Sequence, residues 1–125
     1  MSDEKYGRDA DIIDEFLAEY DKRYNIKERT LRSFWEVYTS YISEDPEEAG
    51  RFGLYDKSSV SADFIGLSYR CVPPENFSSA GCEVCAAVEM TRTSDGKKIG
   101  RYLFYTDLHG RVSDDVFFDS YDNYE

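Results

Sequence analysis

The fold is decided by residues 82–106, which read CEVCAAVEMTRTSDGKKIGRYLFYT. In the first part, small or apolar residues occupy every second position, namely Cys82, Val84, Ala86, Val88 and Met90. A period of two predicts a β-strand with one apolar face. The dipeptide Asp95-Gly96 follows, and Asp-Gly between two strand-like runs predicts a hairpin with a type I′ turn. Residues 98–106 supply the returning strand.

Further strands are predicted on both sides of this hairpin. Before it, apolar and polar residues alternate over residues 65–71, and Pro73-Pro74 ends that strand. After it, residues 107–110 read Asp-Leu-His-Gly, which predicts a tight turn, and residues 111–118 return as a fourth strand. We therefore expect four consecutive antiparallel strands.

Two helices are predicted before the strands. Over residues 9–24, apolar residues recur at a spacing of three to four, which predicts an amphipathic helix. A second helix follows, with Asn25 as its capping residue, and it ends before Pro46. Residues 44–63 are expected to be a connection with room for a short turn of helix.

These elements predict an α+β fold in a single domain that spans residues 1–125, with frayed ends at residues 1–8 and 120–125. The two N-terminal helices are expected to pack on one face of a four-stranded antiparallel meander, because each layer buries its apolar face against the other.

The chain is strongly acidic. Its 125 residues hold 15 Lys and Arg against 26 Asp and Glu, a net charge of −11. This charge disfavours nucleic acid and anionic membranes as partners, because both attract cationic side chains. An aromatic content of 16% argues against disorder. No apolar run approaches the ~20 residues of a membrane span, and the start lacks the apolar segment of a secretory signal, so we expect a cytoplasmic protein.

The three cysteines are expected to be free and buried, each packing as a small apolar side chain. An odd number does not suggest a disulfide framework. Cys82 and Cys85 are three residues apart on a predicted strand, so their sulfur atoms would lie on opposite faces. A structural zinc site needs four ligands, and the chain has one histidine and no second Cys-x-x-Cys pair. We therefore expect no metal and no cofactor.

No catalytic residue emerges from the titratable side chains. His109 precedes Gly110 in a predicted turn and is expected to be exposed. Glu83 and Glu89 lie opposite the apolar face of their strand, which favours solvated acids. Adjacent acids on a strand point to opposite faces, so Asp114 and Asp115 cannot form a catalytic dyad. We therefore expect a protein that is not an enzyme.

The most informative segment is the C-terminal run SDDVFFDSYDNYE, residues 113–125, with five acids, four aromatic residues and no base. Residues 43–48 add four more acids. One interpretation is a solubilising surface. The other is a docking surface for a basic protein, in which aromatic rings supply contact area and charge raises the association rate. The residues expected to bind such a partner are Asp114, Asp115, Asp119, Tyr121, Asp122 and Tyr124.

In size and composition the chain resembles the small, acidic, tyrosine-rich immunity or antitoxin proteins of bacteria. The resemblance implies an inhibitor that covers the cationic active site of a basic toxin, such as a nuclease. It rests on no motif and assigns no residue.

A second resemblance is to the cystatin-like cone of polyketide-cyclase-like proteins. It rests on residues 102–105 (YLFY), 109–111 (HGR) and 117–119 (FFD), which are similar to the last hairpin of that fold. The cone implies a small-ligand-binding protein or a cofactor-free enzyme, with a pocket lined by Tyr102, Phe104 and Trp35. An adaptor without a toxin partner is the third alternative.

Overall fold

The computed structural model describes residues 2–72 and 81–118, and it confirms the α+β architecture. The helical elements are α1 (Ser2–Tyr24), α2 (Ile26–Glu44), α3 (Pro46–Arg51) and the short 3-10 turn η1 (Lys57–Ser59). The strands are β1 (Val60–Val72), β2 (Gly81–Arg92), β3 (Lys98–Asp107) and β4 (Val112–Phe118). Their order in the sheet is β1-β2-β3-β4, and every neighbouring pair is antiparallel. The helices followed by a four-stranded meander are as predicted.

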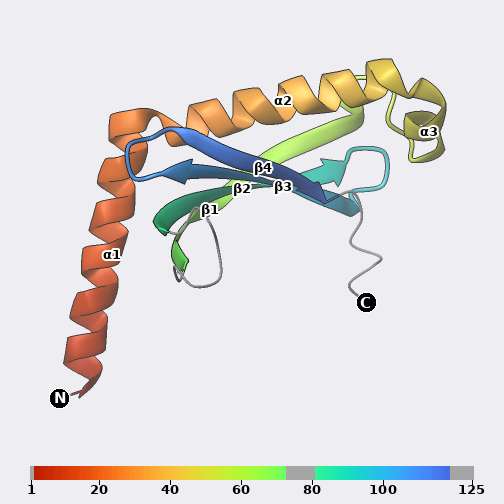
Figure 1. Cartoon of the computed structure of the whole chain (residues 1–125). Coiled ribbons are helices and arrows are strands. Elements are labelled where there is room, and N and C mark those ends of the chain that lie inside the picture. The colour runs from red at the N-terminus through yellow and green to blue at the C-terminus, as the bar shows by residue number, and fades with distance from the viewer. Residues whose placement is uncertain (1, 73–80, 119–125) are drawn as a thin grey trace.

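The core lies between α2 and one face of the sheet, with α2 running across that face (Figure 1). Alternate side chains of β2 and β3 are buried there, namely Val84, Ala86, Val88, Met90, Tyr102, Phe104 and Thr106. From α2, Ile26, Thr30, Phe34 and Tyr38 are buried at helical spacing. Phe34 is central, because its ring packs against those of Tyr38, Tyr102 and Phe117.

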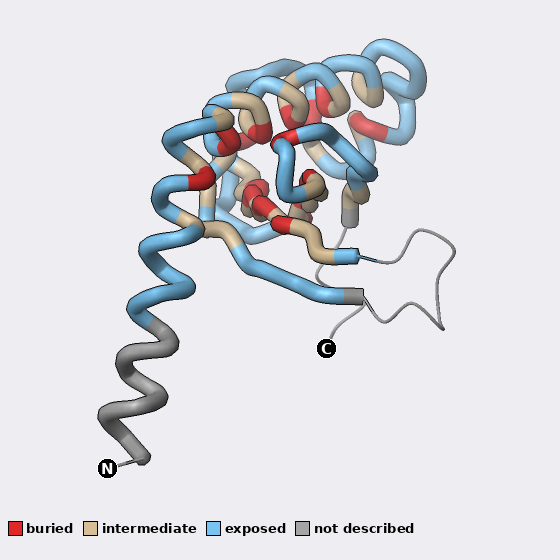
Figure 2. Tube along the Cα trace, turned by 60° about the vertical axis from the view of Figure 1, so that its left-hand side comes forward, coloured by how far each residue is buried: buried red, intermediate tan, exposed pale blue. Residues whose placement is uncertain are grey.

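α1 departs from the prediction in two ways. It begins at Ser2 and not at Asp9, and it does not lie flat on the sheet. Only its C-terminal turns meet the body of the fold, while the rest runs away from it (Figures 1 and 2). Ile12 and Phe16 therefore stay 57% and 40% exposed, whereas Tyr20 is 4% exposed.

The corner between α1 and α2 is fixed by several local contacts. Asn25 is the N-cap residue of α2, as predicted, but it has a left-handed backbone (φ 53°) and its side chain makes no capping hydrogen bond. Asp21 instead accepts a hydrogen bond of 2.8 Å from the Lys27 N–H. Tyr24 packs on Gly110, where an added Cβ would lie 2.5 Å from the tyrosine ring. Only glycine allows this close approach, because φ at Gly110 is also positive, at 78°.

The sheet contains irregularities that the sequence pattern does not predict, including a register shift in each described strand pair. A bulge at Ile65 interrupts the pairing of β1 with β2 and leaves Ile65 exposed. The hairpin between β2 and β3 is present, but its turn is not type I′, because Gly96 has a positive φ and Asp95 does not. Asp95 is instead paired with the Arg92 guanidinium, at 2.5 Å.

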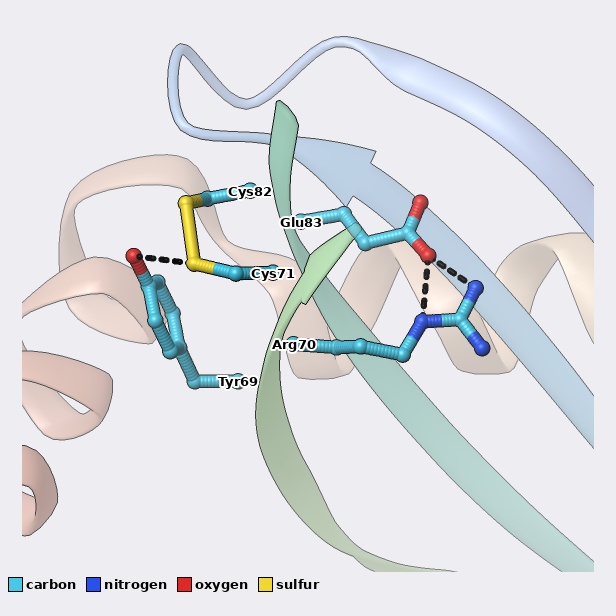
Figure 3. The surroundings of a disulfide bond; sticks show 5 residues. All are labelled: Tyr69, Arg70, Cys71, Cys82 and Glu83. Carbon is cyan, nitrogen blue, oxygen red and sulfur yellow. Dashed lines mark hydrogen bonds and ion pairs between the residues drawn. A yellow bond between two sulfur atoms is a disulfide. The ribbon is translucent and has the colours of Figure 1, made fainter. Parts of the chain in front are cut away.

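The expectation of three free cysteines is wrong. Cys71 and Cys82 face each other across β1 and β2, with 4.1 Å between their Cα atoms, and form a disulfide. Only Cys85 remains free. Figure 3 shows the disulfide and Tyr69 on one side of the two strands and Arg70 with Glu83 on the other. Disulfides persist mainly in oxidising compartments, so this bond stands against the predicted cytoplasmic location, which stays a prediction.

Replacing Cys71 and Cys82 with serine is expected to lower the free energy of unfolding by about 3 kcal/mol, because a cross-link over a short loop restricts the unfolded chain. The two cysteines are 11 residues apart in sequence. Denaturant unfolding with and without a reductant measures the effect, and Cys85→Ser serves as the control that keeps the bond. Three titratable thiols in the unreduced, unfolded protein would contradict the pairing.

Three tyrosine hydroxyls are buried where the layers meet. The Tyr20 hydroxyl lies 2.7 Å from Thr106 Oγ1, and the Tyr38 hydroxyl donates to the Asp56 carbonyl at 2.8 Å. Burial raises the pKa of Tyr20 and Tyr102, and it raises the pKa of Tyr38 to about 12. All three therefore stay neutral to a higher pH in the folded protein than in the unfolded chain.

The protein is expected to lose stability above pH ~10, where unfolded tyrosine ionises. Between that pH and the pKa of Tyr38, about 12, the unfolded chain releases a proton that the folded chain keeps. The free energy of unfolding then falls with rising pH, by about 1.4 kcal/mol per pH unit for this one group. Tyr38→Phe is expected to reduce that slope in urea unfolding, and Tyr55→Phe, at a 70% exposed residue, to leave it unchanged. Equal slopes for Tyr38→Phe and wild type would contradict the assignment.

Candidate functional site: acidic surfaces and an apolar cavity

The two described acids of the predicted partner-binding set lie on β4 and point in opposite directions. Asp115 is opposite Phe104 in the register, and Asp114 is opposite Tyr105. Asp115 therefore shares the α2 side of the sheet, whereas Asp114 shares the other face. Both are exposed. The prediction that they do not form a dyad agrees with this register.

Asp115 is also engaged inside the molecule. Its Oδ2 accepts a hydrogen bond of 2.8 Å from the Tyr102 hydroxyl, and that hydroxyl lies 2.6 Å from Ser33 Oγ on α2. Burial, followed by the Asp115 carboxylate, raises the pKa of Tyr102. The Tyr102 hydroxyl therefore stays neutral and links α2, β3 and β4 through its hydrogen bonds. Asp114 Oδ1 instead accepts a local hydrogen bond of 2.8 Å from the Asp115 backbone N–H.

The remaining four residues of the predicted set, Asp119, Tyr121, Asp122 and Tyr124, lie outside the described residues.

The face of the sheet turned away from α2 has no described helix over it, and its charges are largely paired. Arg70 Nε donates to Glu83 Oε1 at 2.8 Å (Figure 3). Glu89 lies 3.5 Å from Lys98 Nζ and 3.8 Å from an Arg101 nitrogen. The two glutamates predicted to be solvated acids are thus half-buried partners of cationic side chains. Paired charges contribute little to the field that steers a partner.

Cys85 lies on this same face beside Tyr105 and Arg70. Burial raises the pKa of its thiol, with the Tyr105 hydrogen bond and the Arg70 charge acting in the opposite direction. A thiol that stays protonated is a weak nucleophile. This arrangement does not favour covalent chemistry at Cys85.

The helices carry charge in three separate blocks. Residues 11–19 hold four acids and no base, residues 22–32 hold five bases and one acid, and residues 36–48 hold five acids and no base. The acids of the two outer blocks are exposed. The first block also exposes Ile12, Ile13 and Phe16. The helical spacing of those three residues predicts that they lie in the core. The four acids around them, with no base to pair with, are the sequence signal that this part of the helix faces solvent.

An apolar cavity of about 240 Å³ lies beside the C-terminal half of α2. Its lining is entirely aliphatic, aromatic or thioether, namely Val37, Tyr38, Tyr41, Phe52, Leu54, Met90, Ile99 and Phe117. The pocket that the cone resemblance implies, lined by Tyr102, Phe104 and Trp35, is not formed. Tyr102 and Phe104 are 0% and 4% exposed and belong to the packed core.

The other sequence-based expectations concern single residues or exclusions. His109 is exposed, as predicted, and its N–H donates to Asp107 Oδ1 at 2.8 Å. Among the described residues, no cluster of three or more His, Cys, Asp or Glu side chains is arranged to hold a metal ion. Within the same part of the chain, no helix is long and apolar enough to cross a membrane.

Comparison with known proteins finds no matching family model, no matching curated protein and no matching solved structure.

Proposed function

We propose that the protein is a non-catalytic inhibitor of the immunity or antitoxin type, which binds and covers a basic protein, a cognate toxin. The observation that carries the proposal is the segregation of charge. Residues 113–125 hold five acids and no base, and exposed acids also occupy residues 11–19 without a base among them, while cations on the sheet are held by Glu83 and Glu89. The acids of these two segments therefore have no base within the same segment to neutralise them.

The proposed mechanism is occlusion. Surface acids attract a cationic partner at long range and raise its association rate, an effect that salt screens. Asp114, Asp119 and Asp122, with Tyr121 and Tyr124 among them, are the proposed contacts at the C-terminal end. Tyrosine suits such a contact because its ring is apolar and its hydroxyl can stay hydrated.

A tagged protein, incubated with native cell extract at low salt, is expected to retain one basic protein that a salt step releases and mass spectrometry identifies. The triple charge reversal Asp114→Lys/Asp119→Lys/Asp122→Lys is then expected to weaken binding by at least about tenfold, through a slower association rate. Asp115 is left unchanged because it accepts the Tyr102 hydrogen bond.

The matched control reverses three acids elsewhere, Glu36→Lys/Glu44→Lys/Glu47→Lys, and so changes the net charge equally. It is expected to weaken binding far less. Equal effects of the two triple variants would contradict the C-terminal contact, and the absence of any salt-released basic protein would overturn the proposed function.

A second candidate function follows from the cavity. A volume of about 240 Å³ is below that of typical drug-sized pockets, yet a largely apolar cavity can hold a small apolar molecule. Its chemistry favours a ligand without charge, for which the two tyrosines, Tyr38 and Tyr41, would supply ring contacts.

Indole at saturating concentration is expected to raise the melting temperature, because a ligand that binds only the folded state stabilises it. Ile99→Trp, which fills the cavity from β3, is expected to abolish that shift. Ile65→Trp, at an exposed residue of β1, is the control and is expected to preserve it. No shift in the wild-type protein would remove this candidate.

A further inference from the structure

The middle turns of α1 carry an apolar face that no described part of the chain covers. Ile12, Ile13 and Phe16 are 57%, 48% and 40% exposed. They belong to the same apolar stripe of α1 as Tyr20, which lies one turn further along and is only 4% exposed. Figure 1 shows the reason, since α1 meets the body of the fold at its C-terminal end and runs out past the sheet.

Acids border this face on both sides. Helix neighbours are three and four residues apart, so Glu15 and Glu19 lie beside Ile12 and Phe16 on one flank. Asp14 lies on the other flank, next to the row that holds Ile13. All three acids are exposed, and the structure records no ion pair for them with any described residue.

The C-terminal end of α1 is fixed to the sheet by side-chain contacts. The Tyr20 hydroxyl lies 2.7 Å from Thr106 Oγ1 on β3. The Phe16 ring meets the Tyr69 ring edge-on at 5.8 Å, and the Tyr69 hydroxyl lies 3.3 Å from the Cys71 sulfur of the disulfide. A helix fixed in this way loses little conformational freedom when a partner binds it.

We propose that Ile12, Ile13 and Phe16, with the acids beside them, form a docking site for an amphipathic helix whose apolar stripe is bordered by Lys and Arg. Exposed side chains at helical spacing fit between those of a facing helix, and the acidic borders select a partner of opposite charge. A second copy of this chain is the poorer occupant, because it would bring its own acids against Asp14, Glu15 and Glu19. The inference rests on the proposed function, since it names a surface that would hold the basic partner.

The test uses three synthetic helical peptides, each about as long as α1, with the same leucine stripe but bordered by Lys and Arg, by Gln, or by Glu. Fluorescence anisotropy with the full chain at low salt gives the dissociation constants. The peptide with Lys and Arg is expected to bind at least about tenfold more tightly than the other two.

Ile12→Ser/Ile13→Ser is expected to weaken that binding by about tenfold or more, because it removes the apolar contact and keeps the charge. Its control is Val112→Ser, at a residue 53% exposed on β4, which is expected to leave binding unchanged. Glu15→Gln/Glu19→Gln is expected to weaken binding and reduce its salt dependence, whereas Glu44→Gln/Glu47→Gln, with the same change in net charge, is not. Circular dichroism checks that each variant keeps its helix content.

Equal binding of the three peptides, or binding unaffected by the α1 substitutions, would overturn the inference. The inference would also be overturned if sedimentation shows that the wild-type protein is a dimer and that Ile12→Ser/Ile13→Ser is a monomer, because the occupant of the site would then be a second copy of the chain. The proposed function is judged separately by the basic protein retained from extract. If that protein binds the α1 variants normally and fails only with the C-terminal triple variant, the inference falls and the proposed function stands.

Discussion

The contact between Phe34 of α2 and Tyr102 of β3 is the interaction on which the rest of the structure depends. Both side chains are fully buried, with ring centroids 6.0 Å apart. Because the Tyr102 hydroxyl also reaches Ser33 and Asp115, the same residue fixes the helix to the middle of the sheet and ties in the edge strand. Removal of the Tyr102 side chain would open a large cavity in the core. It would also deprive Ser33 and Asp115 of the hydrogen bonds that they make with its hydroxyl.

This contact also explains why α1 projects. α2 has 19 residues and is about 28 Å long, so it spans the face that the apolar side chains of β2 and β3 present. No comparable apolar face remains for α1 among the described strands except the end of the sheet, where Tyr20 and Tyr24 pack. Asn25, with its left-handed backbone, then turns the chain so that the preceding residues leave the body of the fold.

The parts that the sequence predicts are those governed by local periodicity. The alternation in residues 82–90 gives β2 and its buried face, and the same reasoning places Asp114 and Asp115 on opposite faces of β4. The disulfide escapes such reasoning because it depends on register: Cys71 meets Cys82 only through the pairing of β1 with β2, which includes a bulge at Ile65. The alternation within one strand does not by itself fix which residue of the next strand it faces, because the register also depends on the connection between the strands and on bulges.

The candidate site shows the same division. The sequence shows that acids and aromatic residues are abundant, but only the tertiary structure separates acids that are already engaged from those that face solvent alone. Asp115 is hydrogen-bonded to Tyr102, so its position in an acidic run does not by itself make it available to a partner. Conversely, the stripe that includes Ile12 and Phe16 is typical of a core helix, and periodicity does not reveal that the sheet ends before the stripe does.

Net charge alone therefore does not locate a binding surface in this protein. Charge on the open face of the sheet is balanced at Glu83 and Glu89, and the bases of the helices between residues 11 and 48 are confined to residues 22–32. Acids that lie beside exposed apolar side chains can contribute both attraction at long range and contact at short range. Among the described residues, the middle turns of α1 combine these two properties. For this reason the projecting helix, rather than total acidity, locates the surface that we propose for a basic partner.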